Sequence, residues 1–126
     1  MPDAGPANFA DEDFCYVTTT GRRSGQPHTI EIWFVADADT VYLLSGGGDR
    51  ADWVRNLRAD PRVGLRISDR EWNARARVVT DASEDSRSRR LLATKYQDWR
   101  EGEALSGWAQ TALPVAIEPV SPSRGP

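Results

Sequence analysis

Two short loops in the first half of the chain carry residue types that could bind an anion. The first is Gly21-Arg22-Arg23-Ser24-Gly25, followed by Gln26, between two strand-like runs. Glycine permits backbone turns with positive φ, and arginine presents a planar fork to a phosphate or carboxylate. Ser24 and Gln26 add neutral donors. The loop predicts an anion site, and a solvated hairpin with two surface charges is the alternative.

The second loop is Ser45-Gly46-Gly47-Gly48-Asp49, which leads into a predicted helix start. Unpaired N–H groups and the helix dipole favour an anion at such a position, and Arg50 adds positive charge. The spacing matches neither a Walker loop nor a dinucleotide-binding fingerprint. The alternative is a flexible connection in which Asp49 caps the helix.

Aromatic residues supply a second kind of chemistry. Most of the five tryptophans are expected to pack in the core or between helix and sheet. A subset could instead form the wall of a site for a flat ring. Tyr96, one helical turn before Trp99, could stack in the same way and donate a proton.

Composition limits the classes of function. The 126 residues carry a formal net charge of −3, and nucleic-acid binding, which needs a basic face, is not expected. Cys15 is the single cysteine, so no intrachain disulfide can form and the cytoplasm is the expected compartment. His28 is the single histidine, and no metal site is predicted. No apolar run reaches the roughly 18 residues of a transmembrane segment.

Residue patterns place these loops on a small β-rich domain. Period-two alternation and β-branched residues predict six strands, at 14–20, 29–35, 40–44, 62–67, 72–80 and 113–117. The first three should form an antiparallel meander. Capping patterns predict one helix from Asp49 to about Asp60 and another from Asp81 to about Trp99, with a short turn around Trp108.

We therefore expect a mainly β (α+β) fold, a six-stranded barrel with the helices packed outside. Closure removes exposed strand edges in so small a chain. An open α+β sheet with two helices on one face is the alternative. Residues 1–12 are expected to be a flexible arm, 13–120 the cofactor-binding domain and 121–126 a tail.

Three motifs in this order resemble a known family: Thr18–Pro27, Ser45–Gly48 and Trp53–Pro61. The chain resembles the deazaflavin-dependent nitroreductases and quinone reductases from about Tyr16 to Val120. These are split-barrel oxidoreductases related to the FMN-binding, pyridoxamine-phosphate-oxidase-like proteins. Family members often carry a basic residue where this chain has His28, and some carry lysine at the position of Gly46.

The resemblance implies that the chain binds coenzyme F420, with Arg22, Arg23 and Ser24 on its acidic tail. It implies hydride transfer from the reduced deazaflavin to a quinone, enone or nitro acceptor, with Tyr96 or Ser45 supplying a proton. The implied cofactor-binding set is Arg22, Arg23, Ser24, Gly25, Gln26, Ser45, Gly46, Gly47, Gly48, Arg50, Trp53 and Asn56.

Two other functions stay open at this point. One is an FMN-dependent oxidoreductase of the same fold, and the other is a non-catalytic protein that binds a cofactor or small ligand. A homodimer is expected by analogy with split barrels.

Overall fold

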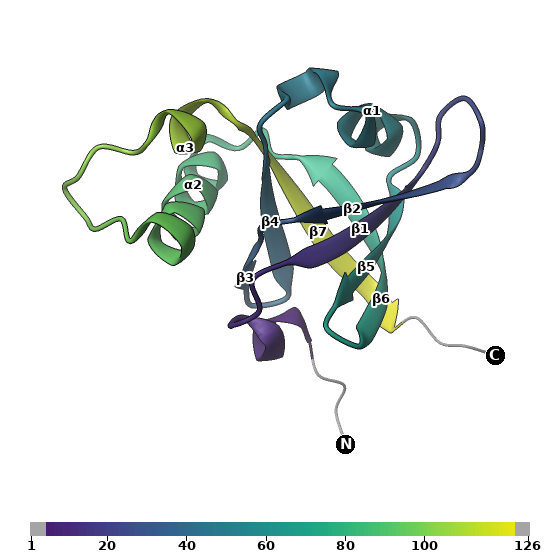
Figure 1. Cartoon of the computed structure of the whole chain (residues 1–126), viewed down its shortest axis with the longest axis horizontal. Helices are drawn as coiled ribbons and strands as arrows, with labels where there is room; N and C mark the ends of the chain where they lie inside the picture. The colour runs from purple at the N-terminus through teal and green to yellow at the C-terminus, as the bar shows by residue number, and fades with distance from the viewer. Residues whose placement is uncertain (1–4, 123–126) are drawn as a thin grey trace.

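The computed structural model describes residues 5–122, which form one antiparallel sheet with helices outside it (Figure 1). The strands are β1 (Cys15–Thr20), β2 (Pro27–Ile32), β3 (Val35–Asp37), β4 (Thr40–Ser45), β5 (Arg62–Ile67), β6 (Arg70–Val78) and β7 (Leu113–Pro122). The helices are α1 (Asp52–Ala59), α2 (Ala82–Gln97) and α3 (Gly107–Thr111), with 3₁₀ turns at Pro6–Phe9 and Gly48–Arg50.

The sheet curls because its two edge strands follow each other in the chain. Its strand order is β2-β1-β5-β6-β7-β4-β3, so β2 and β3 lie at opposite ends. Only Trp33 and Phe34 separate them in sequence, which brings the two edges near one another. No β2–β3 ladder joins these edges among residues 5–122, so the barrel is split rather than closed by hydrogen bonds.

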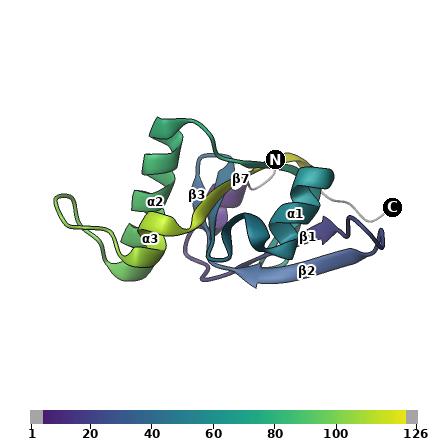
Figure 2. The ribbon, with the colours of Figure 1, turned by 90° about the horizontal axis from the view of Figure 1, so that it is seen from above.

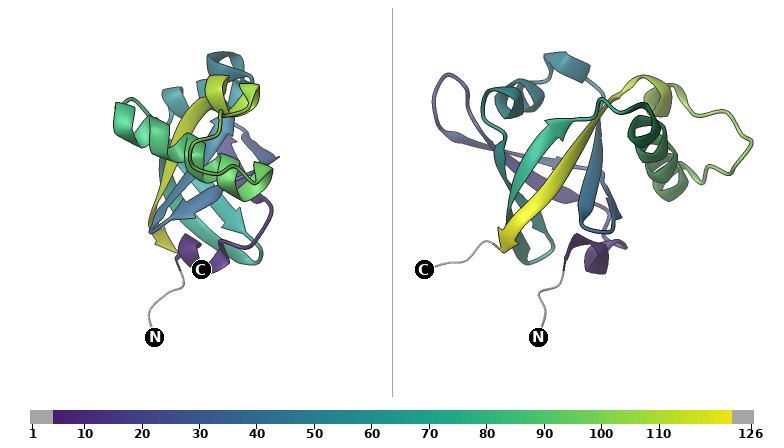
Figure 3. Two further views of the ribbon diagram at one scale, coloured as in Figure 1. Left: turned by 90° about the vertical axis from the view of Figure 1, so that its left-hand side faces the viewer. Right: turned by 180° about the vertical axis from the view of Figure 1, so that it is seen from behind.

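Alternation along the strands builds the interior of this curled sheet. On β1, Cys15, Val17 and Thr19 are buried while the residues between them are half-exposed. Phe34 is fully buried, and Ile30 and Ile32 pack against the same cluster, as their period-two spacing predicts. A second cluster forms where Leu92 of α2 meets β4 and β7, so α2 covers the outer face of those strands (Figure 3).

The expected number of six strands is wrong, because the predicted strand 29–35 is broken. Phe34 donates its N–H to the Tyr96 hydroxyl at 3.0 Å, and its carbonyl accepts from Lys95 Nζ at 3.0 Å. These α2 side chains take the backbone groups that a continuous ladder would use. The chain therefore ends β2 at Ile32 and starts the short seventh strand at Val35.

The predicted three-stranded antiparallel meander is also wrong, although two hairpins form in this part of the chain. β1 pairs with β2, and β3 pairs with β4, but β4 pairs on its other side with β7. Residues Val41–Ser45 of β4 are all buried, which suits a strand covered on both faces rather than an edge.

Of the two predicted helix caps, the one at Asp81 is correct and the one at Asp49 is wrong. Asp81 caps α2, accepting from the Glu84 N–H at 2.9 Å, as predicted. Asp49 does not cap α1: the chain makes a 3₁₀ turn, α1 begins at Asp52, and the Asp49 carboxylate instead pairs with Arg58 at 2.6 Å.

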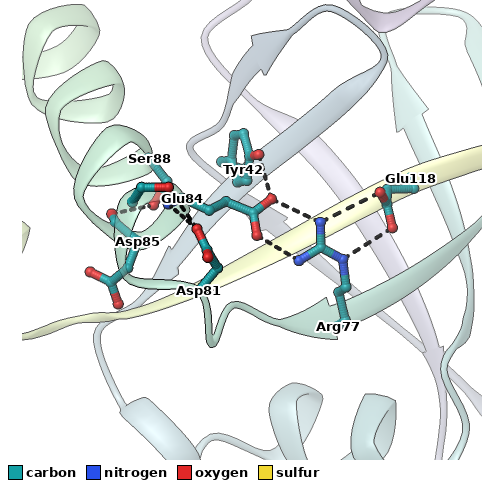
Figure 4. Close-up of polar contacts among 8 residues, drawn as sticks. Tyr42, Arg77, Asp81, Glu84, Asp85, Ser88 and Glu118 are labelled. Carbon is teal, nitrogen blue, oxygen red and sulfur yellow. Dashed lines mark hydrogen bonds and ion pairs between the residues drawn. The ribbon is translucent and has the colours of Figure 1, made fainter.

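One charged network anchors α2 to the sheet (Figure 4). Glu84 accepts from the Tyr42 hydroxyl at 2.6 Å and from Arg77 at 2.7 and 2.8 Å. Arg77 also pairs with Glu118 of β7 at 3.1 Å. Hydrogen bonds from Arg77, and then from Tyr42, hold the pKa of Glu84 below its ordinary value. Burial beside Glu84 raises the pKa of Tyr42 to about 12.

The ends of the described chain pack on this framework. Within the predicted arm, Phe9 of the 3₁₀ turn meets Trp72 edge-to-face at 5.9 Å. At the other end β7 continues to Pro122, two residues into the predicted tail, and pairs with β6 there. Residues 1–4 and 123–126 of the predicted arm and tail lie outside the described residues.

Candidate functional site

The arginine loop connects β1 to β2 and lies beside α1, as the view from above shows (Figure 2). The Gly21 N–H donates to the Gln26 carbonyl at 2.8 Å, which closes the loop. Gly25 has a φ of +73°, a conformation that favours glycine. A Cβ on Gly21 would lie 2.6 Å from Ser24 Oγ and 2.8 Å from His28 Nε2, so both side chains fold over a bare backbone.

Asn56 of α1 fixes the first arginine. Its Oδ1 accepts from the Arg22 backbone N–H at 3.2 Å and from the guanidinium at 2.9 Å. Its Nδ2 donates to the buried Thr19 hydroxyl at 3.2 Å. Asp52, whose side chain is 84% exposed, pairs with the same guanidinium at 3.2 Å. The helix therefore orients Arg22, whose side chain is 24% exposed, and leaves other guanidinium N–H groups unused.

These residues line a hollow of about 460 Å³, which we name the arginine cradle. It is lined by Gly21, Arg22, Arg23, Ser24, His28, Thr29, Ile30, Asp52, Trp53 and Asn56. Arg23 is exposed and has no ion-pair or hydrogen-bond partner among residues 5–122. Gly25 and Gln26 belong to the loop but do not line the hollow. The cradle thus joins five predicted cofactor-binding residues: Arg22, Arg23, Ser24, Trp53 and Asn56.

The glycine loop lies apart from the cradle lining. Ser45 is buried at the end of β4, and its hydroxyl donates to the Gly48 carbonyl at 3.2 Å. Gly46 and Gly47 are exposed, and Gly48 has a φ of +60°. Ser45, Gly46, Gly47, Gly48 and Arg50 precede α1 without lining the same hollow as Arg22 and Arg23.

A second hollow, of about 500 Å³, follows the cradle along β2; we name it the aromatic pocket. It is lined by Phe14, Glu31, Ile32, Trp33, Leu44, Gln97 and Trp108. Trp33 stacks on Tyr96 with ring centroids 4.3 Å apart and meets Trp108 edge-to-face at 5.4 Å. The sequence indicated that some tryptophans could form the wall of a site for a flat ring. It could not predict that Trp33 and Trp108 share one hollow, because they are far apart in the sequence and only the fold brings α3 near the end of β2.

The hydroxyl of Tyr96 is bonded to the backbone. It accepts from the Phe34 N–H and lies 2.8 Å from the carbonyls of Phe34 and of Asp13, to one of which it donates. Burial raises the pKa of Tyr96 to about 12, so the hydroxyl keeps its proton at neutral pH. Next to it, Lys95 donates to the carbonyls of Glu12 and Phe34, and burial lowers the pKa of its ammonium.

Other titratable groups do not form a site of their own. Cys15 is fully buried, and burial raises the pKa of its thiol to about 12, which makes it a packing residue rather than a nucleophile. Within the described part of the chain, histidine, cysteine and carboxylate side chains form no cluster that could hold a metal. No helix there has the length and apolarity to cross a membrane.

Comparison with solved structures defines the class of fold. A conserved hypothetical protein of Mycobacterium tuberculosis superposes with a TM-score of 0.78 at 21% identity, covering 96% of this chain and 81% of that protein. A structure described as an F420-H2 dependent reductase gives a TM-score of 0.62 at 19% identity, covering 84% and 93%. The fold is the split barrel of these proteins.

Sequence then gives the family. The F420H(2)-dependent quinone reductase family matches residues 6–119, and the chain belongs to this family. An F420H(2)-dependent quinone reductase of Mycobacterium tuberculosis is 31% identical over 64 residues, which are 48% of this chain and 43% of that protein. The match spans less than half the length of this curated relative.

Proposed function

We propose that the chain is an F420H2-dependent quinone reductase whose arginine cradle holds the acidic tail of the coenzyme. One observation carries this proposal: two arginines line the same hollow. Asn56 orients the Arg22 guanidinium, and Arg23 has no partner within residues 5–122. Family membership supports the identity of the ligand.

The donor set of the cradle fits an anionic tail. Two guanidiniums can each present a fork of N–H groups to phosphate or carboxylate oxygens, and the Ser24 hydroxyl adds a neutral donor. The Asp52 carboxylate offsets part of the charge of Arg22 but is largely exposed and can turn to solvent. Because Arg23 loses no internal partner, binding there replaces only water.

When bound, reduced F420 supplies a hydride. A quinone that takes this hydride together with one proton from the protein would become a hydroquinone, and the proton that the coenzyme loses on oxidation would pass to solvent. The protein's own residues hold the anionic tail, orient the ring and supply the proton. Enones and nitro compounds are further candidate acceptors, and a homodimer is proposed by analogy with other split barrels.

Tyr96 and Ser45 remain the proposed proton donors. Each hydroxyl lies within bonding distance of a backbone carbonyl, at 2.8 Å for Tyr96 and 3.2 Å for Ser45. Either would have to exchange that contact for the acceptor before giving up its proton.

Titration of the deazaflavin fluorescence with the protein tests the cradle. We expect Arg23→Ala to weaken F420 binding and the Arg22→Ala/Arg23→Ala double variant to weaken it by about tenfold or more, since charge-assisted hydrogen bonds are worth about 1.5–3 kcal/mol each. Arg58→Ala is the matched control, because Arg58 is on α1 but pairs with Asp49 outside the cradle. Unchanged affinity in the double variant would remove the basis for this site.

A further inference from the structure

We propose that Asp52 is a displaceable internal anion of the arginine cradle. It occupies the Arg22 guanidinium in the free protein and yields that position only to a ligand that carries several negative charges. The inference rests on the proposed function for the identity of that ligand, the coenzyme tail. The displacement itself can be measured with an inorganic polyanion.

Asn56 and Asp52 hold the same guanidinium at two different nitrogens. Asn56 Oδ1 accepts from Arg22 Nη1 at 2.9 Å, while Asp52 Oδ1 accepts from Arg22 Nη2 at 3.2 Å. The two partners differ in burial, because Asn56 is 4% exposed and the Asp52 side chain is 84% exposed. Loss of the Asp52 contact therefore leaves the guanidinium oriented by Asn56, with Nη2 open to a new oxygen.

The Asp52 carboxylate is free to leave. Arg22 is the only partner of this carboxylate among residues 5–122. An ion pair this exposed contributes little to stability, since water replaces the lost contact. After it leaves, the carboxylate still lies in the first turn of α1, where the helix dipole favours negative charge. Displacement is therefore an exchange of anions at Nη2 and needs no rearrangement of the cradle.

This exchange makes the cradle selective for polyanions. A ligand with a single carboxylate gains nothing at Arg22, because it replaces one carboxylate with another. Arg23 lines the same hollow and, within the described part of the chain, has no partner to lose. A chain of negative groups that meets both arginines gains the Arg23 contact as well, and linking the two contacts raises its overall affinity.

Asp49 supplies the matched control for a purely structural role of Asp52. Both are acidic residues at the entry to α1, but Asp49 pairs with Arg58 at 2.6 Å and does not line the cradle. If Asp52 acted only through the helix dipole or through the general field of its charge, removal of the Asp49 charge would have the same effect on binding.

Isothermal titration calorimetry with sodium tripolyphosphate tests the inference, with F420 titrated in parallel by fluorescence. Asp52→Asn keeps an oxygen for Arg22 but removes the charge. We expect it to strengthen the binding of both ligands by about two- to fivefold, the range that an exposed ion pair permits. Asp49→Asn should change either affinity by less than about 1.5-fold, because solvent and salt screen its charge. Urea unfolding checks that both variants are folded.

The Arg22→Ala background separates displacement from simple repulsion. If Asp52 acts by occupying Arg22, the Arg22→Ala/Asp52→Asn variant should bind both ligands as Arg22→Ala does, within about 1.5-fold. A carboxylate that merely repelled the ligand would still do so in this background. Sodium acetate that replaces sodium chloride at equal ionic strength should leave tripolyphosphate binding to the wild-type protein unchanged, because it offers only one carboxylate.

The outcomes separate this inference from the proposed function. Equal strengthening by Asp49→Asn, strengthening that survives in the Arg22→Ala background, or competition by acetate overturns the inference. Wild-type protein that does not bind tripolyphosphate, or an Asp52→Asn variant that binds it no better, also overturns it. If tripolyphosphate behaves as expected but F420 does not bind, the inference stands and the proposed function fails. If F420 binding requires both arginines but neither ligand responds to Asp52→Asn, the proposed function stands and the inference fails.

Discussion

Replacement of Asn56 by alanine should both destabilise the protein and weaken the arginine cradle. Asn56 is 4% exposed and joins three groups: the Arg22 backbone, the Arg22 guanidinium and the Thr19 hydroxyl. No other described side chain connects α1 to both the start of the arginine loop and β1 in this way. The alanine variant removes all three hydrogen bonds at once.

The size of the effect follows from burial. The contact with Thr19 is buried, so its loss costs about 1 kcal/mol. The Arg22 side chain is 24% exposed and can partly regain water, so its two contacts add about 1 kcal/mol more. We expect a fall of about 2 kcal/mol in the free energy of unfolding. A guanidinium that must be ordered on binding costs about 0.5–1.5 kcal/mol, which weakens F420 binding by roughly two- to thirteenfold.

Urea unfolding followed by circular dichroism measures the first quantity, and titration of F420 fluorescence measures the second. Arg58→Ala is again the control, because it breaks one half-exposed ion pair on the same helix and should cost less than about 0.5 kcal/mol. An Asn56→Ala variant as stable as Arg58→Ala, or one with unchanged F420 affinity, would refute the role given to Asn56.

Two further substitutions test the anchoring of α2 and the proton donor. Glu84→Gln should cost about 1 kcal/mol at pH 7, since it weakens the contacts with Arg77. Because the pKa of Glu84 is lower in the folded state, its carboxylate stabilises the fold at pH values above the unfolded-state pKa. That stabilisation is lost as pH falls through the folded-state pKa. The urea midpoints of variant and wild type should therefore converge as pH falls below about 4.3. A gap that persists in acid would contradict this. Tyr96→Phe should lower stability by about 1 kcal/mol and, for a proton donor, reduce kcat by about tenfold or more; a stability loss alone would assign the hydroxyl to structure.

Local patterns predicted the parts of the fold that depend on neighbours in sequence. Alternation at Ile30, Ile32 and Phe34 gave the correct inward face, and Asp81 gave the correct helix cap. The break after Ile32 could not be predicted, because it depends on Tyr96, which comes more than sixty residues later in the chain.

In the candidate site, too, the features set by neighbouring residues could be predicted and those set by distant residues could not. The tight turn of the arginine loop could be predicted because its residues are contiguous and include two glycines, while its role in binding stays a prediction. The cofactor-binding set implied by the resemblance includes the glycine loop as well as the arginine loop. Ser45–Gly48 do not line the cradle, and their contact with the coenzyme stays a prediction. The aromatic pocket draws on β2, β4, α2 and α3, whose meeting is decided by strand order and by the α2 anchor, not by spacing.

The central claim is that the arginine cradle holds the acidic tail of F420. Parallel titration of the wild-type protein with F420 and with FMN, followed by ligand fluorescence, tests it most directly. The account predicts saturable F420 binding at least about tenfold tighter than FMN binding, with the preference lost in the Arg22→Ala/Arg23→Ala variant. FMN binding that is tighter than F420 binding, or F420 binding that is indifferent to both arginines, would contradict it.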